Sequence, residues 1–204
     1  MVLILTVHGL NGSSLTHIPM KKYLEYYIKC NERLVIDSVN YKSKSISFDD
    51  ATNIVKSYLD NFSWNSDNEF AILIGHSLGG IIVTHIDHKR IKGVITISSP
   101  HADCAFAKYI KENVPSGLSD VIFGQMYDVL TNPPKMTSVP KIICITGSIL
   151  PNVKFDGQVY TNEMVHSQAY KILHLDYVEH GTQLISIRLF RLVYDAVVEL
   201  INTA

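Results

Sequence analysis

The chain has 204 residues, of which 47% are hydrophobic and 18% charged. This much apolar material can bury one sizeable core, so the composition predicts a single globular domain over residues 1–204 and excludes a largely disordered chain. The 18 Lys and Arg residues against 19 Asp and Glu residues give a formal net charge of −1 at pH 7. Such a balance provides no broad basic face and argues against nucleic acid as a partner.

The lengths of the apolar runs and the use of cysteine indicate the cellular compartment in which the protein acts. No apolar run approaches the roughly 20 residues that a membrane-spanning helix needs, and the first residues lack the basic stretch of a signal peptide. Cys30, Cys104 and Cys144 are odd in number and widely spaced, which indicates free thiols rather than a disulfide framework. We therefore expect a cytoplasmic protein without a transmembrane segment, and transient contact with a membrane surface stays open.

Six short segments rich in β-branched and large apolar residues predict strands. In chain order they are residues 2–8, 33–41, 70–75, 93–98, 141–147 and 171–178. Between them, helical spacing of apolar residues predicts helices over residues 19–30, 49–62, 78–88 and 182–201. Nearly continuous hydrophobic strands are typical of a parallel sheet that is covered on both faces. The alternation predicts a doubly wound α/β fold with about six mostly parallel strands and helices on both faces.

The longest departure from this alternation is the connection over residues 101–139. Two helices are predicted within it, over residues 105–112 and 119–130. Ligands of open parallel sheets bind beyond the carboxyl ends of the strands, and a long connection at that edge can cover the site. We expect a short helical cap whose apolar residues either suit an acyl chain or only pack the cap onto the sheet.

The sequence Gly75-His76-Ser77-Leu78-Gly79 stands between a predicted strand and a predicted helix. It fits G-x-S-x-G, the sharp strand–turn–helix that lifts a serine hydroxyl above the sheet. Backbone N–H groups at the start of the helix favour negative charge that develops there. The pattern predicts Ser77 as a nucleophile, and a chance glycine-rich helix start is the alternative.

The first predicted strand ends in His8-Gly9-Leu10-Asn11-Gly12. A glycine-containing turn here would aim the backbone N–H of Leu10 at the space above Ser77, and the N–H of Leu78 would be a second donor. Two such donors are what the oxyanion of acyl transfer needs. The pair predicts an oxyanion hole, although H-G-x-x-G alone is no more than a strand-ending turn.

A serine nucleophile needs a base, and the base needs an orienting carboxylate, in the chain order Ser, Asp or Glu, His. Asp156 follows the fifth predicted strand and is the expected acid, with a plain Asp-Gly turn as the alternative. His180 lies in the loop after the sixth strand and is the preferred general base. His174 is expected to be a packed histidine within the strand, and His166 a residue of a surface loop or short helix.

Other histidines accompany these motifs. His8, His76 and His101 stand beside the predicted strand ends and are expected to bind substrate, with a structural role in the loop as the equal alternative for His101. His85 and His88 have the i, i+3 spacing of two ligands on one helix, but the sequence offers no obvious third ligand. We therefore predict no metal and no cofactor.

Together these residues resemble the α/β-hydrolase superfamily, and within it the compact serine lipases and esterases. The segments that carry the resemblance are residues 7–12, 75–80, 97–101, 156–159 and 180–181. They span nearly the whole chain in the family's order, and the serine turn is the most specific of them. The resemblance implies Ser77 as nucleophile, Asp156 as orienting acid, His180 as general base, and the backbones of Leu10 and Leu78 as oxyanion donors.

Two features depart from the family pattern. The sequence opens at what would be the family's third strand, as in the smallest lipases. In addition, residues 170–176 resemble the histidine segment of larger calcium-binding bacterial lipases. That resemblance would make His174 the base and Asp176 a calcium ligand.

The sequence therefore predicts a serine hydrolase that cleaves carboxylic esters of small molecules or lipids through an acyl-enzyme. An acyl thioesterase would use the same residues, and the motifs do not separate the two. An inactive hydrolase fold that serves as a binding module is the alternative from another class. The intact set of Ser77, Asp156 and His180 argues against it, since a site without catalytic function has no physical need of all three residues.

Overall fold

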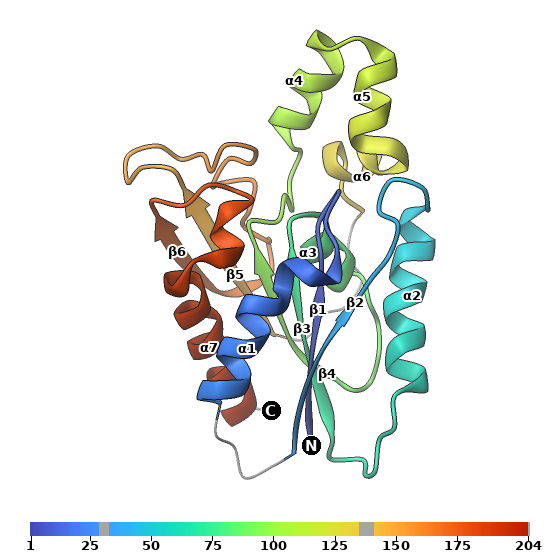
Figure 1. The fold of residues 1–204 in the computed structure, drawn as a ribbon, viewed down its shortest axis with the longest axis vertical. Coiled ribbons are helices and arrows are strands. Elements are labelled where there is room, and N and C mark those ends of the chain that lie inside the picture. The colour runs from blue at the N-terminus through green and yellow to red at the C-terminus, as the bar shows by residue number, and fades with distance from the viewer. Residues whose placement is uncertain (29–32, 135–140, 204) are drawn as a thin grey trace.

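The computed structural model describes residues 1–28, 33–134 and 141–203, and a six-stranded sheet forms its centre (Figure 1). The strands are β1 (Val2–Val7), β2 (Leu34–Val39), β3 (Phe70–His76), β4 (Ile91–Ile97), β5 (Lys141–Ser148) and β6 (Ala169–Asp176). They lie in the order β2-β1-β3-β4-β5-β6, and every neighbouring pair is parallel. The predicted doubly wound α/β fold is confirmed.

Helices cover both faces of the sheet because successive strand residues point to opposite sides. On one face, Leu3 and Leu5 of β1 pack into a core with α2 (Phe48–Asn61) and α3 (Leu78–Val83). On the other face, the intervening Val2 and Ile4 pack into a second core. That core includes residues of α1 (Ile18–Tyr27) and α7 (Ile187–Asn202). Within the described residues, no helix combines the length and apolar character that a membrane crossing requires.

Two predicted elements end earlier than their apolar pattern suggests. The helix after β3 stops at Val83, where the Thr84 hydroxyl donates to the Gly80 carbonyl at 3.0 Å and to the Ile81 carbonyl at 2.8 Å. In a longer helix the Ile81 carbonyl would accept the His85 N–H, but it accepts the Thr84 hydroxyl and the His85 N–H donates to the Ile82 carbonyl at 3.0 Å, so the prediction to residue 88 is wrong. Likewise β6 ends at Asp176, because Tyr177 turns the chain with a φ of 61°.

The connection between β4 and β5 contains α4 (Ala105–Asn113), α5 (Ser116–Phe123) and α6 (Tyr127–Thr131). The single helix predicted over residues 119–130 is wrong, since the chain breaks at Gly124, whose φ is 55°. A Cβ at Gly124 would lie 2.2 Å from the carbonyl oxygen of Lys44. The break lets the chain fold back onto the β2–α2 loop, a contact that no local pattern records.

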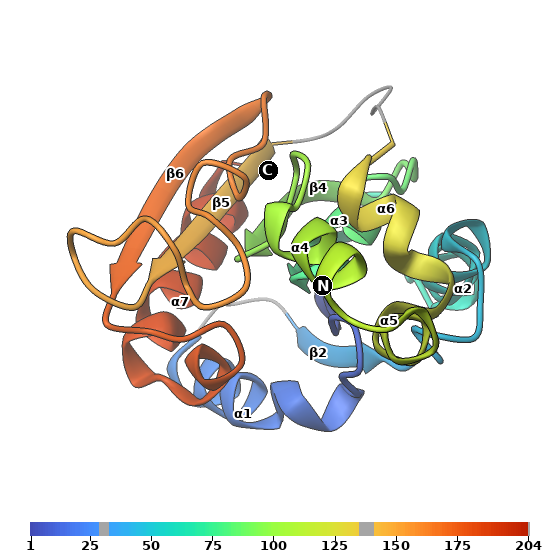
Figure 2. The ribbon, with the colours of Figure 1, turned by 90° about the horizontal axis from the view of Figure 1, so that it is seen from above.

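These three helices stand over the carboxyl ends of the strands, at the top of Figure 1. Seen from above in Figure 2, α4 lies beside the long connection between β5 and β6. Hydrogen bonds join the two segments, for example from the Ala105 N–H to Glu163 Oε1 at 3.1 Å. The long connections after β4 and β5 therefore meet at the edge of the sheet where the motif residues lie.

Candidate active site

Ser77 occupies the sharp turn between β3 and α3. Its backbone has a φ of 53° and a ψ of −124°, which is rare for a residue with a side chain and costs conformational energy. Gly79 is required two residues later, because a Cβ there would lie 2.2 Å from the Val7 carbonyl oxygen of β1. The turn therefore holds the Ser77 side chain above the sheet, half-buried, as the motif predicts.

His180 and Asp156 meet at the same edge from two other loops. Nδ1 of His180 lies 2.7 Å from Oδ2 of Asp156, and both side chains are buried. The other carboxylate oxygen, Oδ1, accepts backbone N–H groups of Gln158 at 3.0 Å and Val159 at 2.8 Å. With Oδ1 occupied, Oδ2 is directed at the imidazole, so His180 donates from Nδ1 and is left with Nε2 as an acceptor.

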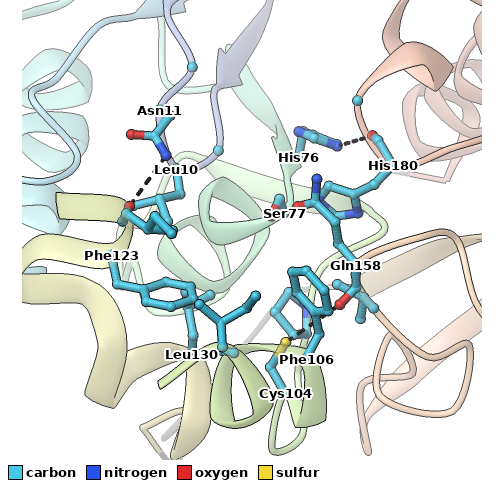
Figure 3. A pocket seen from close by; sticks show the side chains of 18 of the residues that line it. Leu10, Asn11, His76, Ser77, Cys104, Phe106, Phe123, Leu130, Gln158 and His180 are labelled. Atoms are coloured by element: carbon cyan, nitrogen blue, oxygen red, sulfur yellow. Dashed lines mark hydrogen bonds between the residues drawn. The ribbon is translucent and has the colours of Figure 1, made fainter. Parts of the chain in front are cut away.

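Ser77 and His180 line one cavity of about 470 Å³. Figure 3 shows the Ser77 side chain beside the imidazole of His180. Apolar side chains of the β4–β5 connection form the far wall, namely Phe106, Ala107, Ile110, Ile122, Phe123 and Leu130. A cavity of this size can hold an organic molecule of moderate size. The polar groups of the cavity, among them Ser77 and His180, lie at the end opposite the apolar wall.

The loop after β1 forms the wall opposite His180. Gly12 N–H donates to the Gly9 carbonyl at 3.1 Å, which closes a tight turn around Leu10. Asn11, with a φ of 58°, donates from its backbone to Ser43 Oγ at 3.0 Å. No hydrogen bond to another described residue uses the N–H of Leu10 or of Leu78. Leu78 begins α3, where N–H groups have no partner within the helix.

The family model of the PGAP1-like alpha/beta domain matches residues 4–179, which contain the serine turn and Asp156. The chain belongs to this family. A search of curated proteins found no match.

Solved structures with the same fold include lipases and esterases. This PGAP1-like domain is similar to the mature lipase BlEst2 of Bacillus licheniformis, with 19% identity, a TM-score of 0.67, and coverage of 95% of this chain and 90% of the lipase. It is also similar to an Arabidopsis methylesterase, with 15% identity, a TM-score of 0.64, and coverage of 97% and 99%. At these identities the likeness establishes the fold, which is the α/β-hydrolase fold of these lipases and esterases and agrees with the expected fold.

The three histidines that were expected to bind substrate lie in different places of the PGAP1-like domain. His76 lines the cavity, and its Nε2 contacts the carbonyl oxygen of His180 at 3.0 Å (Figure 3). His8 lies outside the lining and is buried against Tyr41, with ring centroids 4.2 Å apart. Its Nε2 accepts the Tyr41 N–H at 3.2 Å and its Nδ1 contacts the Gly9 carbonyl at 2.8 Å, so it anchors the Leu10 loop.

His101 and His166 form a second pair outside the cavity lining. Their rings pack edge to face with centroids 5.0 Å apart. Burial lowers the pKa of His101 to about 3 and also lowers the pKa of His166. His166 is 8% exposed, so its expected place at the surface is wrong.

His174 and Asp176 lie on the edge strand β6, away from the cavity lining. His174 Nε2 contacts Asp176 Oδ1 at 3.0 Å, and Nδ1 contacts the Thr146 hydroxyl at 2.7 Å. The His174 side chain is exposed, in contrast to the packed position expected within the strand. The structure therefore places His180, and not His174, beside Ser77.

The two remaining histidines of the predicted i, i+3 pair contact different groups. His85 Nε2 contacts the Pro134 carbonyl at 2.7 Å, whereas His88 Nε2 lies 3.3 Å from Asp60 Oδ1. Within residues 1–28, 33–134 and 141–203, no group of three His, Cys, Asp or Glu side chains is arranged to hold a metal ion.

Two buried residues near the site were missed by the sequence analysis. Glu163 accepts the Ala105 N–H at 3.1 Å and the Tyr160 N–H at 3.1 Å, and burial raises the pKa of its carboxyl group. Gln183, which is 1% exposed, contacts His180 and Ser98. Both follow a motif residue by only a few positions, but nothing in their local sequence marks them as partners.

Proposed function

We propose that this PGAP1-like domain hydrolyses carboxylic esters with Ser77 as nucleophile, His180 as general base and Asp156 as orienting acid. The observation that carries the proposal is the 2.7 Å contact between His180 Nδ1 and Asp156 Oδ2 at a cavity that Ser77 also lines. Because the three residues follow β3, β5 and β6, parallel strands bring them to one sheet edge. The strained backbone conformation of Ser77 supports a functional role for this residue.

In the proposed reaction, Ser77 Oγ attacks the ester carbonyl carbon while its proton passes to Nε2 of His180. The oxyanion of the tetrahedral intermediate accepts hydrogen bonds from the N–H groups of Leu10 and Leu78. His180 then gives the proton to the leaving alkoxide, and the acyl group remains on Ser77. Water attacks this ester while His180 takes its proton; the bond to Ser77 Oγ then breaks, His180 returns the proton to Oγ, and the acid departs. Asp156 holds the imidazole by its Nδ1–H throughout.

The cavity wall supports a substrate with an apolar acyl group. We propose that α4, α5 and α6 act as a cap and that their apolar side chains receive this group. Among the described residues that line the cavity, none has an Asp, Glu, Lys or Arg side chain. A charged acyl group would therefore lose its hydration without an ion partner, whereas a hydrocarbon chain gains by leaving water.

Hydrolysis of p-nitrophenyl esters from acetate to palmitate tests the proposal. We expect activity in the wild type and a fall of roughly 1000-fold or more in kcat for Ser77→Ala and His180→Ala. His174→Ala is the matched control, because this exposed histidine lies outside the cavity lining. Full activity in Ser77→Ala would contradict the mechanism, and loss of activity in His174→Ala alone would move the base to β6.

A fluorophosphonate probe separates an active hydrolase from an inactive binding module. We expect covalent labelling of the wild type, located at Ser77 by mass spectrometry, and none in Ser77→Ala. Comparison of kcat/KM on matched oxygen esters and thioesters then separates an esterase from a thioesterase.

We also propose a reducing compartment, the cytoplasm, as the place of action. Cys104 and Cys144 are free and buried thiols, which fits reducing conditions. The expectation for Cys30 lies outside the described residues.

A further inference from the structure

The side-chain amide of Gln183 is held between the loop of His180 and the end of β4. Gln183 lies in the 3-10 helix Thr182–Ile185, directly before α7. Its Nε2 donates to the main-chain carbonyl of His180 at 2.7 Å, and its Oε1 accepts the Ser98 hydroxyl at 3.1 Å. Ser98 is fully buried, and its own N–H donates to the Ile145 carbonyl of β5 at 2.8 Å. The amide therefore connects the loop of the proposed base to the buried carboxyl end of β4.

His76 provides a second donor to the same carbonyl. Its Nε2 lies 3.0 Å from the His180 oxygen and 3.4 Å from Gln183 Nε2. A carbonyl oxygen only accepts, so the hydrogen-bond network assigns the proton of His76 to Nε2. Burial and the neighbouring His180 keep the pKa of His76 well below its usual value, so this ring stays neutral. Because His76 directly precedes Ser77, this bond also links the nucleophile turn to the loop of the base.

The main chain of His180 is held on its other side as well. Its N–H donates to the main-chain carbonyl of Asp156 at 2.8 Å, while the imidazole contacts the Asp156 carboxylate. The next residue, Gly181, is exposed and has no side chain to fix the loop. Without the bonds from Gln183 and His76 to the His180 carbonyl, the backbone of His180 would be held only through its N–H.

We propose that Gln183 is a positioning residue, which acts through His180 by fixing the carbonyl of this residue and hence the direction of its imidazole. This inference rests on the proposed function, because it assigns His180 the role of base. Gln183 is not among the residues that line the cavity, so its effect on turnover is indirect. A displacement of about 1 Å in a reacting group costs on the order of 100-fold in rate, and the Gln183 bonds oppose such a displacement.

The kinetic test compares the wild type with Gln183→Leu, which removes both amide contacts at similar volume. We expect kcat on p-nitrophenyl butyrate to fall by roughly 10- to 100-fold while KM stays within about twofold. Gln168→Leu is the matched control, since Gln168 is exposed and lies on the β5–β6 connection, and it should keep both constants. A folded Gln183→Leu variant with the kcat of the wild type would overturn the inference.

Ser98→Ala keeps the inference testable if Gln183→Leu does not fold. This change removes only the hydroxyl that holds the Gln183 amide. We expect a smaller fall in kcat than for Gln183→Leu, again with little change in KM. Unchanged kcat in both folded variants, or in Ser98→Ala alone if the other does not fold, rejects the positioning role.

A measurement that needs no turnover separates this inference from the proposed function. We expect the proton on Nδ1 of His180, which is bonded to Asp156, to give a low-field proton NMR signal that can be assigned by its loss in His180→Ala. We expect this signal to broaden or shift in Gln183→Leu and to stay unchanged in Gln168→Leu. An unchanged signal in Gln183→Leu contradicts the positioning role, whatever the enzyme hydrolyses. Full activity in Ser77→Ala, by contrast, contradicts only the proposed function.

Discussion

Nδ2 of Asn11 donates to the main-chain carbonyl of Ile122 at 3.3 Å, which joins the loop after β1 to α5 across the cavity (Figure 3). Asn11 follows Leu10, and Ile122 belongs to the apolar wall. The bond therefore connects the proposed oxyanion loop with the segment proposed to receive the acyl group. We therefore expect a substitution at Asn11 to affect both the loop after β1 and the apolar wall formed by α5.

Asn11→Gly removes this bond and keeps the backbone, because glycine adopts the φ of 58° without strain. A single hydrogen bond of this kind contributes about 1 kcal/mol, so we expect kcat/KM on p-nitrophenyl octanoate to fall about fivefold. Asn113→Gly is the control, since the Asn113 amide bonds the Tyr109 carbonyl within α4. Equal kcat/KM values for the wild type and Asn11→Gly would show that the contact has no effect on turnover.

The apolar wall should determine the preferred chain length. Ile110 lines the cavity from α4, so Ile110→Trp shortens the space for an acyl chain. We expect kcat/KM on decanoate to fall by about tenfold or more while the value on acetate changes little. Tyr109→Trp, at an exposed position of the same helix, should leave the profile of the wild type. A parallel loss on all esters would place the acyl group elsewhere.

Gly79 is a packing requirement of the serine turn. In Gly79→Ala the new Cβ meets backbone atoms of Val7 and His8, at 2.2 and 2.6 Å, which side-chain rotation cannot relieve. We expect loss of at least about 3 kcal/mol of unfolding free energy, together with loss of hydrolysis. Gly117→Ala is the matched control on α5, where no atom lies within 4 Å of a new Cβ. In a helix this second change should be neutral or stabilise by up to about 1 kcal/mol, as urea unfolding would measure.

His17 should make the protein sensitive to acid. It is 1% exposed, neither ring nitrogen has a hydrogen-bond partner among the described residues, and burial lowers its pKa from 6.5 to about 4. Between these two values the unfolded chain binds the proton and the folded protein does not, so stability falls as the pH falls. From pH 7 to pH 5 this amounts to about 2 kcal/mol.

His17→Leu removes this contribution. Urea unfolding at pH 7 and pH 5 should show a smaller loss of stability in the variant than in the wild type. Other buried histidines, such as His101, still titrate in the variant, so the sensitivity is reduced and not abolished. An identical loss in both proteins would mean that His17 does not titrate as a buried neutral group.

The sequence contained enough information for the fold and for the residues gathered at the cavity. Ser77, Asp156 and His180 each follow a strand with a clear apolar pattern, and in a parallel sheet those strand ends share one edge. Their meeting could thus be expected from chain order alone. The roles of these residues stay predictions until the variants are measured.

Other features depend on contacts between segments far apart in the chain. The break at Gly124 follows from its contact with Lys44, and no pattern around residue 124 records that contact. Gln183 is recognised only by its bonds to Ser98 and to the carbonyl of His180. His8 resembles a pocket residue in the motif but uses both nitrogens within the protein. Contacts of this kind between distant segments cannot be predicted from the periodicity of apolar residues or from the spacing of motifs.

The edge strand β6 leads directly to His180, whereas β3, which leads to Ser77, lies in the middle of the sheet. Edge elements open more readily than central ones, so local opening of β6 would displace the imidazole while the serine turn is still intact. The proposed hydrolysis would then report on whether β6 is formed. In refolding experiments, recovered hydrolysis should lag behind recovered circular dichroism, and on heating it should vanish before the central strands lose amide protection.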